Sequence, residues 1–76
     1  MNETQIEYRK ADGFKEEMPS EVGLWQIVCG ENANIACHVA ITKSKGVLWV
    51  HDPDIGIYDL KSYHNGLTHP MWKKLM

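Results

Sequence analysis

The sequence lacks the features that mark a membrane-spanning or secreted chain. No stretch approaches the roughly 20 consecutive apolar residues that a bilayer-spanning helix needs. The polar start of the chain, Met1 to Gln5, has no basic run followed by an apolar one, so a signal peptide is not expected. These absences predict a cytoplasmic protein with no membrane partner.

Basic residues are also scarce. Lysine and arginine number 8 against 10 for aspartate and glutamate, which gives a formal net charge of −2. Proteins that bind nucleic acids usually carry a positive excess, because the phosphate backbone supplies most of their affinity. The charge balance therefore disfavours nucleic-acid binding and is compatible with binding a basic surface on another protein.

Only two cysteines are present, Cys29 and Cys37. Thiols stay reduced in the cytosol, and a free cysteine usually packs as a small buried apolar side chain. We therefore expect two buried thiols, with a disulfide or a metal site as the alternatives.

The chain has 76 residues, which is enough for one small domain, residues 1–76. Hydrophobic residues make up 43% and charged residues 24%, which is typical of a folded domain. A domain of this size buries a modest share of its surface, so its stability is marginal unless a disulfide, a metal or a second copy of the chain adds to it.

Two segments have the pattern of paired strands. Residues 24–29 are rich in strand formers, and residues 35–42 alternate between apolar and other side chains. Folding them symmetrically about Ala33 places apolar residues opposite one another, and a shift of one residue destroys this match. The predicted facing pairs are Cys29 with Cys37, Ile27 with Val39, and Trp25 with Ile41.

The neighbouring segments complete the predicted fold. Residues 4–10 alternate with period two, which favours another strand, and Asp12-Gly13 after them is a turn signal. A three-residue loop, Ser44-Lys45-Gly46, would place Trp49 opposite Ile41, on the same apolar face as Trp25.

The C-terminal third predicts a short edge strand at 55–58 and a short helix at 59–66. Asp59 suits the N-cap and Gly66 the C-terminal stop, and Thr68 suits the cap of a last helical turn that contains Met71, Trp72 and Leu75. The whole pattern predicts an α+β domain. Its sheet is a meander of three to four antiparallel strands, covered on the apolar face by the C-terminal helical segment.

Candidate chemical groups are few. The cysteines and histidines lack the spacing of a zinc site, and neighbouring residues on a strand, such as Cys37 and His38, point to opposite faces. The segment His51-Asp52-Pro53-Asp54 contains a base and two carboxylates, but it also fits an ordinary turn held by aspartate side chains. We therefore expect no catalytic site, cofactor or metal.

The aromatic residues near the C-terminus allow two interpretations. Trp and Tyr dominate protein interfaces, because each buries a large area with few rotatable bonds. Tyr63, Met71 and Trp72 are therefore interpreted either as the lid of the core or as part of an interface.

Length, mild acidity and the lack of a catalytic motif lead to a functional hypothesis. In these properties the chain resembles the small accessory proteins of bacteriophages, including anti-CRISPR and other anti-defence inhibitors. The resemblance implies a non-enzymatic protein-binding module in the host cytoplasm. It would bind a larger host protein, through a basic surface meant for nucleic acid. The candidate acidic contacts are Glu16, Glu17, Glu21, Asp52, Asp54 and Asp59.

Two other function classes stay open. A module for single-stranded nucleic acid would use Lys43, Lys45, Lys73 and Lys74 with aromatic side chains between them. A metal-stabilised interaction domain is the other. Homodimerisation is also plausible, because an exposed edge strand in a small sheet tends to find a partner.

Overall fold

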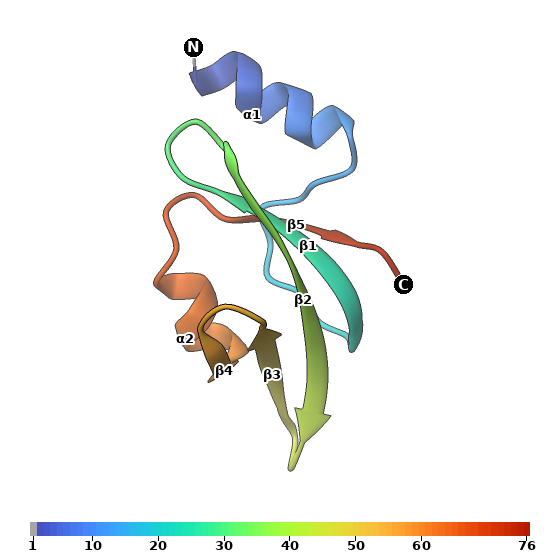
Figure 1. Cartoon of the computed structure of the whole chain (residues 1–76). Helices are drawn as coiled ribbons and strands as arrows, with labels where there is room; N and C mark the ends of the chain where they lie inside the picture. Colours follow the sequence, from blue (N-terminus) through green and yellow to red (C-terminus); the bar gives the residue numbers. More distant parts are fainter. Residues whose placement is uncertain (1) are drawn as a thin grey trace.

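Residues 2–76, which the computed structural model describes, form one five-stranded antiparallel sheet and two helices (Figure 1). The strand order across the sheet is β4-β3-β2-β1-β5. The predicted α+β class is confirmed. In chain order the elements are α1 (Asn2–Ala11), β1 (Gly23–Cys29), β2 (Ile35–Ser44), β3 (Val47–Asp52), β4 (Gly56–Asp59), α2 (Leu60–Asn65) and β5 (Met71–Lys74).

Strands β1 and β2 pair as predicted, but in a different register. Cys29 lies opposite Ile35, and Cys37 lies opposite Ile27, so the register symmetric about Ala33 is wrong by two residues. A shift of two keeps every side chain on its predicted face. Ile27, Val39 and Ile41 are therefore buried on one side of the sheet, although the two thiols are not directly opposed.

The β2–β3 turn differs from the predicted three-residue loop. It has two residues, Lys45 and Gly46, with φ angles of 53° and 78°. Positive φ at both positions is typical of the type I′ turn, whose twist suits a hairpin. The pairing consequently shifts by one residue, and Trp49 lies opposite Thr42 instead of Ile41. Trp49 therefore faces away from the core that contains Trp25.

The segment after β3 agrees with the sequence pattern. Strand β4 lies at the edge of the sheet, and α2 follows it directly. The Asp59 carboxylate accepts a hydrogen bond from the Ser62 N–H at 3.0 Å, as an N-cap does, and Gly66 forms the C-cap. Leu60 and Tyr63 of α2 pack into the core.

The chain's two ends were predicted wrongly. Residues 71–74 form strand β5, not a helical turn, and β5 pairs with β1. Residues 4–10 belong to helix α1, not to a strand. Six of the ten residues of α1 are glutamate, glutamine, arginine, lysine or alanine, which are strong helix formers, and Arg9 and Lys10 in its last turn suit the helix dipole. The Asp12-Gly13 turn is confirmed, with Gly13 at a φ of 100°.

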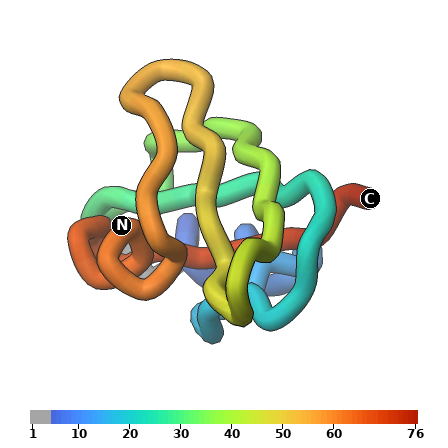
Figure 2. Tube along the Cα trace, turned by 90° about the horizontal axis from the view of Figure 1, so that it is seen from below, coloured from blue at the N-terminus to red at the C-terminus, as the bar shows by residue number. Residues whose placement is uncertain are grey.

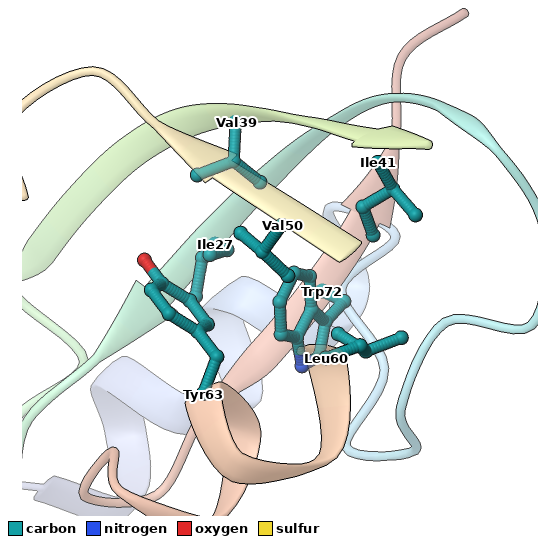
Figure 3. Close-up of a cluster of buried hydrophobic side chains, with 7 residues drawn as sticks. All are labelled: Ile27, Val39, Ile41, Val50, Leu60, Tyr63 and Trp72. Atoms are coloured by element: carbon teal, nitrogen blue, oxygen red, sulfur yellow. The ribbon is translucent and has the colours of Figure 1, made fainter. Parts of the chain in front are cut away.

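Two groups of buried side chains hold the sheet. The main core lies between the sheet and α2. Figure 3 shows its side chains packed about Trp72, with the Tyr63 side chain pointing from α2 into the core. A second core, made of Phe14, Val28, Ala33 and Met71, lies on the other face, where Ile6 of α1 packs against it. The main core consists of Ile27, Val39, Ile41, Val50, Leu60, Tyr63 and Trp72.

No helix within residues 2–76 is long and apolar enough to span a membrane.

Candidate functional site

The predicted acidic contacts do not form one surface. Glu16, Glu17 and Glu21 lie in the segment between α1 and β1, and Lys15 of that segment bridges to Trp72 of β5. Glu16 pairs with Lys10 at 3.0 Å, and Glu21 pairs with Lys74 at 2.6 Å. These three residues therefore flank the β5 edge of the sheet.

The other three acidic residues belong to the opposite edge. Asp54 is exposed in the β3–β4 turn, and Asp59 ends β4. Asp52 is only 8% exposed, so it is not a surface contact. The structure thus divides the predicted acidic set between two edges and removes one member into the interior.

The side chain of Asp52 is held inside the fold by hydrogen bonds. Its carboxylate accepts hydrogen bonds from the Tyr63 hydroxyl at 2.6 Å and from the Asp54 N–H at 2.8 Å. Burial acts to raise the pKa of Asp52, but these hydrogen bonds, with one from the backbone of Ile55, outweigh it and hold the pKa below its usual value. Burial, and then the bond to Asp52, raise the pKa of Tyr63. The predicted turn held by an aspartate side chain is confirmed at Asp52.

The aromatic candidates lie in the interior. Trp72 is 1% exposed, Met71 2% and Tyr63 8%. The core interpretation of these three residues is therefore the one that the structure shows, and none of them offers an exposed contact. The Trp72 indole N–H donates to Nδ1 of His64 at 2.9 Å, and the two rings stack.

The thiols are free and half-buried. Burial raises the pKa of Cys29 and is also the main cause of the raised pKa of Cys37. A raised pKa disfavours the thiolate, which is the nucleophile and the metal ligand. Within residues 2–76 no three His, Cys, Asp or Glu side chains are grouped as metal ligands.

The lysines of the nucleic-acid alternative are also dispersed. Lys43 lies opposite Leu48, two residues from the buried pair of Ile41 and Val50, so it shares their face. Lys73 and Lys74 lie on β5 and pair with acidic side chains, Lys73 with Asp12 at 3.7 Å.

The two edges of the sheet are protected very differently. Strand β5 carries Lys73 and Lys74, and its outer side is bridged by Lys15, whose N–H and C=O both bond to Trp72 at 2.8 Å. Edge lysines and covering segments are how natural sheets prevent further pairing. Strand β4 has the sequence Gly-Ile-Tyr-Asp, with no lysine, and no bridge to its outer side occurs in the described part of the chain.

Three exposed apolar side chains lie on β4 and in the turn directly before it. Ile55 is 59% exposed, Ile57 61% and Tyr58 44%. We call these three residues the β4 edge surface. Figure 2 shows the β3–β4 hairpin, coloured from yellow to orange, projecting at the top of the view. A group of neighbouring, solvent-exposed apolar side chains indicates an interaction site more strongly than scattered exposed side chains do.

A shallow groove accompanies β4 on each face of the sheet. On the α2 face a groove of about 300 Å³ is lined mainly by apolar atoms. On the other face a groove of about 400 Å³ contains Trp49 and more polar groups. The first is lined by Ile55, Tyr58, Ser62, Tyr63, Gly66 and Leu67, and the second by Thr42, Ser44, Lys45, Trp49, His51 and Ile57.

The sequence predicted an edge strand at 55–58, but we did not identify its side chains as candidate contacts. The signal was available, because Ile55, Ile57 and Tyr58 follow one another closely in a short segment without lysine. Their exposure depends on β4 lying at the edge and on α2 leaving them uncovered, which the local pattern does not specify.

Comparison of the chain with protein-family models, with curated proteins and with solved structures gives no match.

Proposed function

We propose that this protein is a small non-enzymatic protein-binding module, and that it contacts its partner through the β4 edge surface. The observation that carries the proposal is the exposure of Ile55, Ile57 and Tyr58 on an edge that lacks the protection given to β5. Burying these side chains against a partner would remove their apolar area from water, which is the main driving force of association.

The proposal changes which residues make contact. An acidic surface complementary to a basic site on a host protein is not supported, because the acidic residues lie at both edges and two of them are in ion pairs. The interpretation as a phage-encoded inhibitor of a host defence or nucleic-acid-handling protein stays a prediction. It now concerns an apolar edge contact, with Asp54 and Asp59 at the rim.

The test compares two lysine substitutions that carry the same change in charge. Ile57→Lys places a lysine on β4, as natural edge strands do to prevent pairing. Val22→Lys is the matched control, because Val22 is exposed in the loop before β1. The variants are immobilised beside the wild type and exposed to a lysate of the natural host, and the retained proteins are identified by mass spectrometry.

The expected result is a protein retained by the wild type and by Val22→Lys but not by Ile57→Lys. Circular dichroism checks that both variants are folded. A partner that Ile57→Lys retains as well as the wild type does, and that Val22→Lys loses, would contradict the proposal.

A further inference from the structure

The backbone of β4 has N–H and C=O groups that form no hydrogen bond to another strand of the sheet. Strand β4 pairs with β3 over four residue pairs, from Asp52 opposite Gly56 to Trp49 opposite Asp59. In an antiparallel edge strand, alternate residues direct their N–H and C=O groups away from the neighbouring strand. On β4 these groups point to the side where no described residue pairs with them.

The side chains of β4 alternate between the two grooves. Ile57 lies opposite His51 and lines the groove that contains Trp49, whereas Tyr58 lies opposite Val50 and lines the groove beside α2. A strand added alongside β4 would alternate in the same way, so that each of its faces would meet one groove. Main-chain bonds for affinity and pockets for alternate side chains are the elements of recognition by strand addition.

We propose that the partner supplies an extended segment that pairs with β4 as a sixth strand of the sheet. This proposal rests on the proposed function and specifies how the partner binds. The segment has apolar side chains on the face that meets the groove of Ile55, Tyr58 and Leu67, because that groove is mainly apolar. Its other face meets the groove of Trp49 and Ile57, which also contains the hydroxyl groups of Thr42 and Ser44 and the Lys45 ammonium group, and therefore carries both apolar and polar side chains.

The exposed area favours a segment of another protein over a second copy of this chain. At their exposed fractions the three side chains of the β4 edge surface offer on the order of 100 Å² each, or about 300 Å² together. A stable interface buries roughly 800 Å² on each partner. Pairing of β4 with β4 of a second copy would form main-chain hydrogen bonds too, but would leave most of the needed area unsupplied. An extended segment forms the same bonds and can choose side chains that fill the grooves on both faces.

The geometry also disfavours a helix as the bound element. A helix presents one apolar stripe and keeps its main-chain groups bonded within itself. The two grooves lie on opposite faces of the sheet, and the unpaired main-chain groups of β4 lie between them.

The test uses a displayed library of short random peptides as the probe. The library is selected on the wild type, and peptides that also bind Ile57→Lys are removed. Strand addition predicts enriched peptides with apolar residues at every second position. It also predicts that a bound peptide slows hydrogen exchange at the amides of residues 56–59. Proline at the centre of a selected peptide should weaken binding about tenfold or more, because it removes a main-chain donor and its fixed geometry disturbs the pairing.

Three results would overturn the proposal. One is selection of no peptide that distinguishes the wild type from Ile57→Lys. Another is binding that leaves the amides of residues 56–59 exchanging as in the free protein. The third is a concentration-dependent dimer of the protein alone that protects the same amides, which would make a second copy the occupant. A host protein still lost by Ile57→Lys would, with any of these, leave the proposed function standing without strand addition.

Discussion

Replacing Tyr63 by phenylalanine removes the buried hydrogen bond to Asp52 and a weaker hydroxyl contact with the Cys37 thiol. The hydroxyl of Tyr63 donates to the Asp52 carboxylate at 2.6 Å, and both side chains are 8% exposed. Phenylalanine keeps the ring, which packs near Trp72 and Tyr58 with centroid distances of 6.2 and 6.3 Å. The change therefore tests mainly the bond between α2 and the end of β3.

The expected loss of stability is about 2 kcal/mol at neutral pH, since a hydrogen bond to a charged group contributes about 1.5–3 kcal/mol. Asp52 keeps the hydrogen bond from the Asp54 N–H, so its charge is not left without a partner. For a domain of this size the loss lowers the Tm by roughly 10 °C.

The penalty also depends on pH in a defined direction. The pKa of Asp52 is lowered in the folded protein, because the hydrogen bonds to its carboxylate outweigh the effect of burial. A lowered pKa stabilises the fold above the unfolded value, about 3.9, and that contribution is lost as the pH falls through the folded value. The difference between wild type and Tyr63→Phe should thus be largest near pH 7 and should shrink below about pH 4.

Urea unfolding followed by circular dichroism measures this difference at each pH. Tyr58→Phe is the matched control, because the Tyr58 hydroxyl bonds to the Ile55 carbonyl at an exposed position. We expect the control to change stability by less than about 0.5 kcal/mol. Equal stability of Tyr63→Phe and the wild type at pH 7, or a penalty unchanged on acidification, would refute the reasoning.

Two further predictions concern single contacts. The pKa of His64 is lowered by burial, and neutral Nδ1 accepts from the Trp72 indole, so stability should fall as the pH drops below about 6.5, the unfolded histidine value. Urea titrations should show a smaller fall for His64→Gln, with exposed His38→Gln as control; an unchanged fall would contradict this. Lys45→Asn should raise the stability by about 0.5 kcal/mol, because asparagine before Gly46 suits the type I′ turn. Thermal unfolding checks it, and a lower Tm would count against the assignment of the turn.

Local signals were sufficient for the centre of the fold. The strands at 24–29, 35–42 and 55–58 and the helix capped by Asp59 follow from residue types within a few positions of each element. The face of each residue in the first hairpin was also predictable, because side chains alternate along a strand whatever the exact pairing.

The exact register required contacts that the sequence does not show. Apolar matching excludes a shift of one residue but not of two. The β1–β2 turn is held from outside the hairpin, since the Ala33 carbonyl accepts from Arg9 of α1 at 3.2 Å, and the Gly30 N–H donates to the Thr68 carbonyl at 2.7 Å. Ala33 itself is buried in the second core, with a φ of 53°.

The predictions for the two ends of the chain were wrong for different physical reasons. Residues 4–10 alternate by chance, and the helix propensity of their glutamate, glutamine, arginine and lysine residues decides the structure. In β5, Met71 enters the second core and Trp72 the main core, so both faces are buried. A strand buried on both faces shows no alternation and is hard to distinguish from a buried helical turn.

The candidate site was predictable only in part. An edge strand at 55–58 was expected, but we predicted acidic contacts and left Tyr63, Met71 and Trp72 open between the core and an interface, because the sequence does not show which side chains are exposed. Trp72 is a core residue because β5 pairs with β1, whereas the β4 edge surface lies exposed on the edge that no other described segment covers.

Photo-cross-linking tests the central claim most directly. A photoreactive phenylalanine analogue replaces Tyr58 on β4 in one variant and Tyr8 on α1 in another, since both tyrosines are exposed. Each variant is irradiated in a lysate of cells of the organism that produces the protein. The account predicts a covalent adduct with the partner from position 58 and none from position 8. An adduct from position 8 alone would show that the partner binds the helical end of the molecule and would contradict the account.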